Sequence, residues 1–374
     1  DVTIAGASAF DANRVGGVAG AGAGAGAGVW MSEQARLTMA AVDVRGNVAE
    51  GNCSAGAAGG GFAVFNGSVA ILSNLIVANN SVSVAGPASS PDLRGIGLGA
   101  GAWIEGAGAE LVASGVAWLD NSAGSSLALG YGGGIGLGPL GNLTLAASSS
   151  VVGNSASGDG GGLYVSANAH ALVHDSTITA DTASARGGGA AVFGELRLDR
   201  SARIAHCVAL SGHGGCVYIG APGSLLTTNS SLVGCSASDG GGCVANVGGS
   251  LALAGTLLAE CEATSGDGGC IYAAFANLTL EDVHFDACSA PSGRGGAVGL
   301  GELALVDMTR VLLTANSALS GGGGVFVGRD ASVRAVGGRA ARNVVSCGVG
   351  GAWLVTNGSA APDPSLWGFN TANG

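Results

Sequence analysis

Three copies of one pattern follow one another between Cys207 and Ala274: CVALSGHGGCVYIG (207–220), CSASDGGGCVANVGG (235–249) and CEATSGDGGCIYAA (261–274). In each copy a Gly-Gly pair precedes a short apolar run, and its second glycine recurs at Gly215, Gly242 and Gly269, 27 residues apart. A cysteine follows each pair, and another stands seven or eight residues before its second glycine. A fixed period of this size predicts a solenoid, in which each repeat packs only on its neighbours.

The same landmark extends over most of the chain. The second glycine, or its equivalent, falls at Gly28, Gly61, Gly101, Gly134, Gly162, Gly189, Gly215, Gly242, Gly269, Gly296, Gly324 and Gly351. The spacing is 26 to 28 residues from Gly134 onward and 33 to 40 before it. We therefore predict a single domain over residues 1–374, with irregular longer-turn coils in 1–133 and regular coils in 134–374. Both ends break off within the pattern without a visible cap, so we expect a segment of a longer chain.

Each repeat contains three short runs with strand character. The first follows the glycines, and the second alternates with a period of two, as in Leu251-Ala252-Leu253 and Leu303-Ala304-Leu305. The third leads into an apolar residue, two others and then Asn, Asp or Cys, as in Phe285 to Cys288. Runs of this kind between Gly, Asn and Asp indicate strands. Three strands in each ~27-residue repeat predict an all-β parallel β-helix of about 12 coils.

Composition limits the function. Glycine is 73 of 374 residues, 47% of residues are apolar and only 10% are charged, which excludes a disordered glycine-rich linker. The net charge is −11 and every basic residue is arginine. This charge argues against a nucleic-acid partner and against anionic lipid. No stretch is apolar enough to predict a membrane span, and we expect no cofactor.

The pairing of Gly-Gly-apolar with Phe-x-x-Asn, first seen at Phe10 to Asn13, resembles a known family. It is similar to the repeats of polymorphic outer membrane proteins and related β-helical surface proteins with the pectin-lyase-like fold. The resemblance covers the chain from Phe10 to Asn370. It implies a right-handed parallel β-helix solenoid used as an extracellular stalk or adhesin passenger. The cysteines that replace Asn in the middle coils depart from the family pattern.

The repeated cysteines have two interpretations. Each pair could close the turn between its members, joining Cys207 to Cys216, Cys235 to Cys243 and Cys261 to Cys270. Alternatively, the cysteines face inward as thiols or stack on adjacent coils, near the separation that a disulfide tolerates. We expect no metal site, because this spacing forms a repeated ladder rather than a cluster of four ligands.

Seven Asn-X-Ser/Thr sequons suggest a secreted glycoprotein from an oxidising compartment. Four of them follow a Gly-Gly position by five to eight residues, and we expect these in one turn: Asn66, Asn142, Asn277 and Asn357. The others are Asn52, Asn79 and Asn229. We predict N-linked glycans on these residues.

The sequence does not favour an enzyme. Gly212-His213-Gly214 matches a tripeptide of polygalacturonases, but the companion paired aspartates that hydrolysis of a glycosidic bond requires are missing. His213 instead falls in a turn column of mixed charge with Asp159, Arg186, Asp239, Asp267 and Arg294. We therefore expect no catalytic residues.

The position two residues after the Gly-Gly pair is the most informative one. It contains Val217, Val244, Ile271, Val298, Phe326 and Trp353. Because its neighbours are also apolar, we expect one face of this strand inside and the other as an outer stripe that binds a partner. Otherwise these residues are simply good strand formers, or a loop covers them.

The sequence thus favours a non-enzymatic extracellular structural or adhesive glycoprotein segment. It would belong to a cell-surface filament, wall or appendage, for example a ciliary hair, and would associate with protein partners or with itself through the apolar stripe. The alternative is a carbohydrate-binding or carbohydrate-active β-helix, similar to a polysaccharide lyase or hydrolase. A groove in which acidic side chains converge would favour that alternative.

Overall fold

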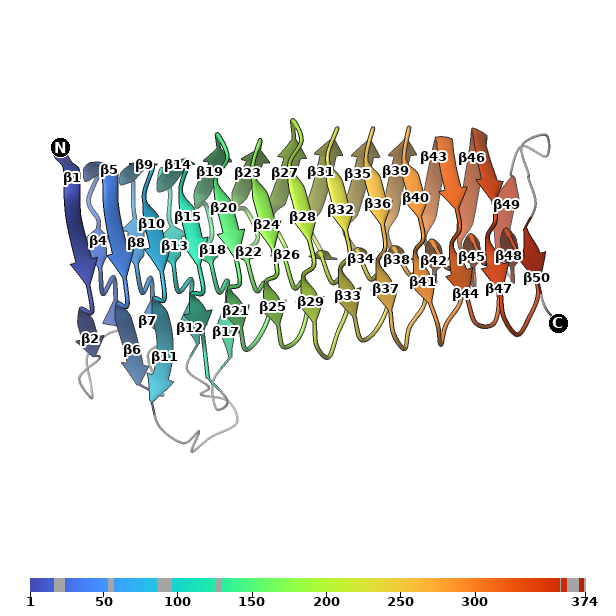
Figure 1. Ribbon diagram of the computed structural model, residues 1–374, viewed down its shortest axis with the longest axis horizontal. Coiled ribbons are helices and arrows are strands. Elements are labelled where there is room, and N and C mark those ends of the chain that lie inside the picture. The colour runs from blue at the N-terminus through green and yellow to red at the C-terminus, as the bar shows by residue number, and fades with distance from the viewer. Residues whose placement is uncertain are drawn as a thin grey trace. The chain divides into compact units, whose positions relative to one another are not determined.

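The computed structural model describes residues 1–16, 24–52, 57–85, 96–125, 129–356, 358–361 and 370–372. It confirms an all-β, right-handed parallel β-helix, and the described residues contain no helix (Figure 1). Accordingly, they contain no helix that could cross a membrane. The chain divides into two compact units, unit 1 (Asp1–Ser184 and Gly189–Leu196) and unit 2 (Ala185–Gly188 and Arg197–Gly374). A single domain over residues 1–374 stays a prediction.

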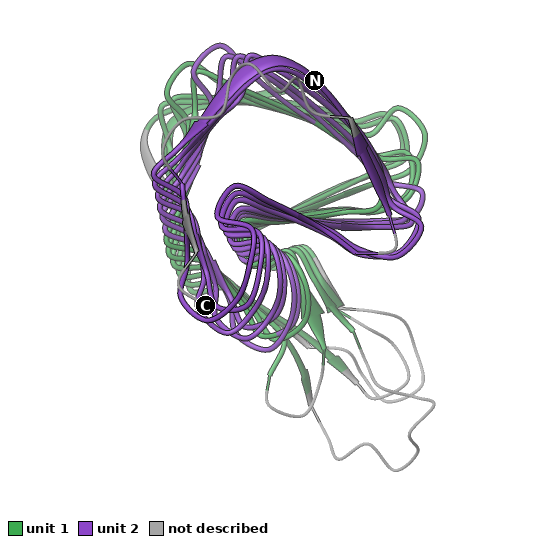
Figure 2. Cartoon of the chain, turned by 90° about the vertical axis from the view of Figure 1, so that its right-hand side faces the viewer, with its two compact units in different colours: residues 1–184, 189–196 green, residues 185–188, 197–374 purple. Residues whose placement is uncertain are grey.

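One coil of unit 2 shows the plan. The three predicted runs form β30 (Val217–Gly220), β31 (Ser224–Thr228) and β32 (Ser231–Val233). A fourth, two-residue strand, β33 (Ser236–Ala237), follows Cys235. The coils then stack with parallel pairing. In Figure 2 the coils within each unit lie one behind another and bend inward on one side.

The other strands of unit 2 repeat this plan. The first-strand sheet continues with β34 (Val244–Val247), β38 (Ile271–Ala274), β42 (Val298–Leu300), β45 (Val325–Val327) and β48 (Trp353–Val355). The second and third strands are β28 (Arg203–Ala205), β35 (Ser250–Ala254), β36 (Leu257–Ala259), β39 (Asn277–Glu281), β40 (His284–Asp286), β43 (Leu305–Thr314), β46 (Ser332–Ala341) and β49 (Ser359–Ala361). The two-residue strands are β29 (Val208–Ala209), β37 (Glu262–Ala263), β41 (Ser289–Ala290), β44 (Ser317–Ala318), β47 (Val344–Val345) and β50 (Thr371–Ala372).

Unit 1 has the same plan with longer turns. Its first strands are β4 (Val29–Met31), β8 (Phe62–Phe65), β13 (Ala102–Glu105), β18 (Ile135–Leu137), β22 (Leu163–Val165) and β26 (Ala190–Val192). Its second and third strands are β1 (Val2–Asp11), β5 (Arg36–Arg45), β9 (Val69–Ser73), β10 (Ile76–Ala78), β14 (Glu110–Ser114), β15 (Ala117–Leu119), β19 (Asn142–Ala146), β20 (Ser150–Val152), β23 (His170–His174), β24 (Thr177–Thr179) and the start of β27 (Glu195–Asp199). The remaining strands are short: β2 (Arg14–Gly16), β3 (Gly24–Ala25), β6 (Val48–Asn52), β7 (Ala57–Ala58), β11 (Ser81–Ala85), β12 (Gly97–Leu98), β16 (Ser122–Ala123), β17 (Gly130–Tyr131), β21 (Ser155–Ala156) and β25 (Thr182–Ala183).

Side chains fill the interior of each unit. The alternating leucines of the second strands, such as Leu251 and Leu253, are buried. One predicted alternation is wrong: Leu303 and Leu305 are 55% and 54% exposed. Leu305 lies in register with Asn277, so Val306 and not Leu305 points inward. A shift of one residue along a strand moves every side chain to the opposite face.

An asparagine ladder runs along the interior of unit 1. Asn13, Asn47, Asn80, Asn121 and Asn154 each donate a side-chain hydrogen bond to the next ladder residue, and the last acceptor is Asp181. In unit 2 the ladder positions contain Cys207, Cys235, Cys261, Cys288, Asn316, Asn343 and Asn370. Such ladders satisfy buried amides and connect neighbouring coils.

Candidate functional site

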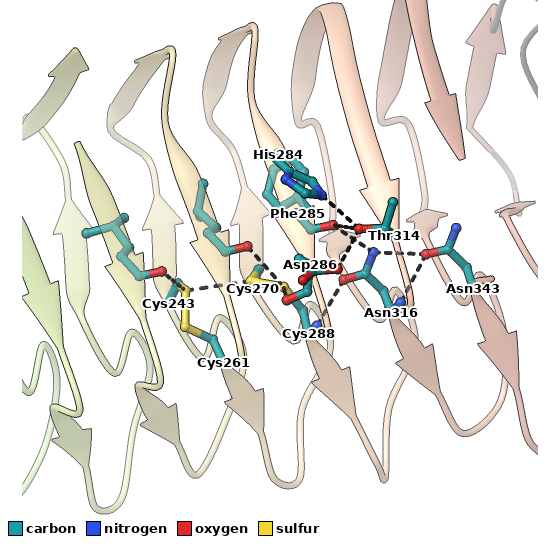
Figure 3. Close-up of a disulfide and its surroundings, with 12 residues drawn as sticks. Cys243, Cys261, Cys270, His284, Phe285, Asp286, Cys288, Thr314, Asn316 and Asn343 are labelled. Atoms are coloured by element: carbon teal, nitrogen blue, oxygen red, sulfur yellow. Dashed lines mark hydrogen bonds between the residues drawn. A yellow bond between two sulfur atoms is a disulfide. The ribbon is translucent and has the colours of Figure 1, made fainter. Parts of the chain in front are cut away.

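Three disulfides cross the interior of unit 2. They join Cys216 to Cys235, Cys243 to Cys261 and Cys270 to Cys288, each with a Cα–Cα distance of 5.4 Å. The first cysteine of each bond directly precedes the first strand of a coil, and the second is the ladder residue of the same coil. Figure 3 shows the second and third disulfides beside Asn316 and Asn343 of the ladder. Each disulfide therefore ties a coil to itself across its core.

The predicted turn-closing pairs Cys207–Cys216, Cys235–Cys243 and Cys261–Cys270 are wrong. The structure joins each cysteine of the Gly-Gly position to the ladder residue that follows it, not to the one that precedes it. Cys288, which was not among the candidates, is consequently a disulfide partner. Cys207 takes no part in the three bonds, and its thiol donates to the carbonyl oxygen of Ala205 at 3.3 Å. By the spacing of the other disulfides, the residue that would pair with Cys207 is Gly189, which has no thiol.

Unit 1 shows what the disulfides replace. Gly162 occupies the position that corresponds to Cys216, and Asp181 the position that corresponds to Cys235. A Cβ atom added to Gly162 would lie 2.7 Å from Oδ2 of Asp181. The carboxylate of Asp181 therefore leaves no room for a Cβ atom at Gly162, whereas two cysteines share the corresponding space in unit 2.

The disulfide sulfurs form a buried cluster. The Sγ atoms of Cys216, Cys243 and Cys261 lie within 4.8 Å of one another, and Sγ of Cys243 lies 3.6 Å from Sγ of Cys270. Metal ions bind thiolates, and these sulfurs are already bonded in pairs, so a metal would require their reduction first. The expected lack of a metal site stays a prediction. Cys347 is exposed, and Cys53 lies outside the described residues.

The predicted outer stripe of the first strands is wrong for most of its members. Val217, Val244, Ile271 and Val298 are 0% exposed and form one column that points into the core. The residue in register with Val298 is Val325, so Phe326 belongs to the neighbouring column that points outward. Trp353 continues the inward column, and it is half-buried. Because both faces of these strands are apolar, the period of two does not reveal which face is inside.

The outward column is covered by the turn that precedes the Gly-Gly pair. The guanidinium of Arg186 lies 4.6 Å from the ring centroid of Tyr218 and donates to its hydroxyl at 3.1 Å. Arg294 lies 4.0 Å from the ring centroid of Phe326. Cations over aromatic rings are stabilising when the ring is desolvated. The other interpretation of this strand, that a loop covers it, is confirmed at these residues.

A histidine and a tyrosine of this layer also stack. The rings of His213 and Tyr272 are 5.7 Å apart and nearly parallel. Nδ1 of His213 accepts a hydrogen bond from the backbone amide of Gly240 at 3.1 Å, and Nε2 lies 4.0 Å from the carboxylate of Asp239. Burial, followed by the negative charge of Asp267, raises the pKa of the Tyr272 phenol. Tyr272 therefore stays protonated at neutral pH and is unsuited to act as a base.

Asp267, an acidic residue of this layer, forms an ion pair. The carboxylate of Asp267 accepts from the guanidinium of Arg294 at 2.7 Å and from the backbone amide of Arg294 at 2.7 Å. Paired N–H donors of a guanidinium fix the orientation of a carboxylate. This arrangement fixes the turn on the sheet.

Aromatic side chains also contact one another in unit 1. The ring centroids of Tyr131 and Tyr164 are 5.0 Å apart, and those of Tyr164 and Phe193 are 5.8 Å apart. The indole of Trp103 donates to Glu105 at 2.8 Å. Contacts between stacked aromatic residues contribute beyond simple burial of apolar area.

The sequons lie at several places on the surface. Asn66, Asn79, Asn229 and Asn277 are exposed and Asn142 is half-buried, while Asn357 and the side chain of Asn52 lie outside the described residues. The first three have positive φ in turns, whereas Asn142 and Asn277 begin strands β19 and β39. The prediction that Asn66, Asn142 and Asn277 share one turn is wrong, because Asn66 lies in the turn before β9, whereas Asn142 and Asn277 are the first residues of their strands. Glycosylation itself stays a prediction.

Sequence reasoning missed one exposed apolar group in unit 2. Phe275 is 55% exposed, and the backbone amide of Phe275 donates to the carbonyl of Glu302, which precedes exposed Leu303. Phe275 and Leu303 both have positive φ in the turn before the second strand. A bulky apolar residue at a left-handed turn position is uncommon, and that was the available signal.

Neither a protein-family model nor a curated protein matches the chain. Among solved structures, the chain is similar to a TibC-catalysed hyper-glycosylated fragment of TibA. The identity is 12%, the match covers 97% of this chain and 100% of the fragment, and the TM-score is 0.26.

Proposed function

We propose that this chain is a non-enzymatic, extracellular structural or adhesive glycoprotein segment of a cell-surface filament, wall or appendage. The observation that carries the proposal is the set of three buried disulfides, one within each of three adjacent coils. Disulfides persist in oxidising compartments, and their main effect is to hold the folded body together.

The packing of the turn layer supports a structural role over a catalytic one. Asp267 is bound by Arg294, and the rings of Tyr218 and Phe326 lie beneath arginine side chains. A polysaccharide hydrolase needs two carboxylates that face its substrate, one as acid and one as base or nucleophile. We propose protein partners or self-association as the means of assembly. The buried column from Val217 to Val298 cannot provide that contact.

Peptide mapping of the protein purified from its native source tests the proposal. Free thiols are alkylated before digestion, and glycans are released by a glycosidase in heavy-oxygen water, which marks each occupied asparagine. We expect the three crosslinks intact and label on exposed sequons such as Asn229 and Asn277. Alkylated Cys216 and Cys243 together with unmarked sequons would indicate an intracellular protein and reject the proposal.

A parallel assay addresses the alternative function. The purified chain is incubated with neutral and acidic polysaccharides, and new reducing ends are measured over time. We expect no turnover. If turnover occurs and is lost in Asp267→Asn or His213→Ala, the protein is a carbohydrate-active enzyme.

A further inference from the structure

Arginines on the outside of unit 2 follow a simple rule over several coils. Four of those from Arg294 onward pair with a carboxylate at the equivalent place in the preceding coil, whereas Arg197 pairs with Asp199 of its own strand. The pairs are Asp267–Arg294 at 2.7 Å, Asp282–Arg310 at 2.7 Å, Glu302–Arg329 at 2.9 Å and Asp307–Arg334 at 3.9 Å. Two more arginines follow, Arg339 on β46 and Arg342 directly after this strand.

These two arginines break the rule. Arg339 lies in register with Leu312, whereas Arg334 on the same strand lies in register with Asp307. Arg342 follows the pair of Thr314 and Ala341, so the equivalent residue of the preceding coil is Ala315. Among the described residues neither guanidinium has a carboxylate partner. The side chains of both arginines are exposed to solvent.

A surface hollow of about 500 Å³ lies where the two arginines meet the sheet. His284, Leu312, Thr314, Arg339, Ala341 and Arg342 line it. Leu312 is 40% exposed and provides an apolar patch at the centre. Nε2 of His284 lies 2.8 Å from Oγ1 of Thr314, which donates to Oδ1 of Asp286 at 2.6 Å (Figure 3).

The charges around this hollow favour an anion. Asp286 is the nearby carboxylate on the same face, but it stands two coils before Ala341, roughly 10 Å along the stack, and it accepts the Thr314 hydroxyl. Arg339 and Arg342 lie at the opposite side of the hollow. A guanidinium binds carboxylate, sulfate and phosphate through paired N–H donors.

We propose that this hollow is a binding site for an oxyanion group of an organic ligand, with Arg339 and Arg342 as donors and Leu312 contacting the adjoining carbon skeleton. The proposal does not depend on the structural role above. It concerns a local cationic site on a chain with a net charge of −11, so bulk electrostatic attraction cannot supply the binding.

Nitrogen-15 labelling of arginine in the whole chain gives a direct test. The protein is titrated separately with sodium sulfate, sodium phosphate and sodium glucuronate at constant ionic strength, and the Nε–Hε signals are followed by NMR. Substitutions Arg339→Lys and Arg342→Lys assign the two signals. We expect saturable shifts confined to these two, and the ranking of the three anions identifies the oxyanion chemistry that the hollow prefers.

Two variants control for net charge. Leu312→Asp places a carboxylate opposite Arg339, as Asp307 stands opposite Arg334, and we expect it to weaken binding about tenfold, the value of one charge-assisted hydrogen bond. Arg334→Ala also lowers the local positive charge but removes an arginine that is already paired, so the affinity should change less than about twofold. Equal weakening by both variants, or no saturable shift with any of the three anions, would overturn the proposal.

Discussion

Asp181 interrupts the asparagine ladder of unit 1, and replacing it with Asn should stabilise the protein. Oδ1 of Asp181 accepts from the backbone amide and the side-chain amide of Asn154 at 2.7 and 2.9 Å. Oδ2 is buried and has no hydrogen-bond partner among the described residues. From Asn47 onward, the side-chain amide of each ladder Asn also donates a second hydrogen bond. Its acceptor is the backbone carbonyl three residues before the ladder residue of the preceding coil. Asn121 donates to Val77 in this way, and Asn154 to Trp118.

The same rule predicts that an Asn at position 181 donates to the carbonyl of Val151. Asp181→Asn therefore keeps the acceptor for Asn154 and turns an unsatisfied oxygen into a satisfied donor. A buried unsatisfied polar atom costs about 1 to 3 kcal/mol, and a new hydrogen bond contributes about 1 kcal/mol. We expect Asp181→Asn to be more stable by about 2 kcal/mol at neutral pH.

The gain should depend on pH in a defined direction. Burial raises the pKa of the Asp181 carboxyl well above its ordinary value, and the hydrogen bonds from Asn154 only partly oppose this. Because the folded pKa lies above the unfolded value of about 3.9, the contribution of Asp181 to stability is fully present below that pH and is lost as the pH rises through the folded pKa. Asn does not titrate, so the advantage of the variant grows over the same window.

Urea denaturation of both proteins at about pH 4 and about pH 7 measures this effect. The two proteins should be nearly equal in acid and separate at neutral pH. Asp11→Asn is a matched control, because Asp11 lies in unit 1 but is exposed, and it should change stability little. If the natural protein and Asp181→Asn lose stability in parallel from acid to neutral pH, the account of the ladder is wrong.

Three further predictions concern the disulfides and the turns that cover the first strands. Cys243→Ala with Cys261→Ala should lower the free energy of unfolding by about 3 kcal/mol in urea denaturation, and an unchanged midpoint would contradict a role in stability. Gly162→Cys with Asp181→Cys should form a fourth crosslink, seen as a loss of two hydrogens by mass spectrometry and as a higher melting temperature under non-reducing conditions, whereas two alkylatable thiols would show that the Gly–Asp and Cys–Cys pairs are not equivalent. Arg294→Met keeps an unbranched side chain over Phe326 but removes the charge, so it should lower the free energy of unfolding by less than about 1 kcal/mol, and by less still in high salt. A loss that salt leaves unchanged would mean that packing rather than charge holds the turn.

The sequence predicted the architecture well because the repeat is short and its landmarks are sterically demanding. A residue with Cβ does not fit at Gly215 or Gly242 without meeting the backbone of the next coil, so the spacing of these glycines reports directly on the stacking of coils. The ladder motif was equally readable, since a buried amide at a fixed place must find its partner in the adjacent coil.

The errors have a common physical cause. Cys235 has two candidate partners, Cys216 before the strands of its own coil and Cys243 eight residues after it, and only the cross-section of the coil decides between them. Likewise, Val217 and Tyr218 are both compatible with either face of their strand, and the choice follows from which side the turn with Arg186 covers. Periodicity gives the repeat, but it does not give the direction in which the chain bends within one repeat.

Cysteine and asparagine stabilise this fold in different directions, within a coil and between coils respectively. An asparagine ladder connects one coil to the next, as Asn316 connects to Asn343 at 2.9 Å, whereas a disulfide such as Cys243–Cys261 closes a single coil and adds no covalent link along the stack. Coils with cysteine at the ladder position therefore give up side-chain amide bonds between coils. Their stacking then depends on backbone pairing, such as the amide of Cys243 to the carbonyl of Cys270 at 3.1 Å, and on contacts between turns, such as Asp267 with Arg294. Contacts such as Asp267 with Arg294 therefore add side-chain links along the stack where the ladder has none, and the loss expected for Arg294→Met measures what one such link contributes.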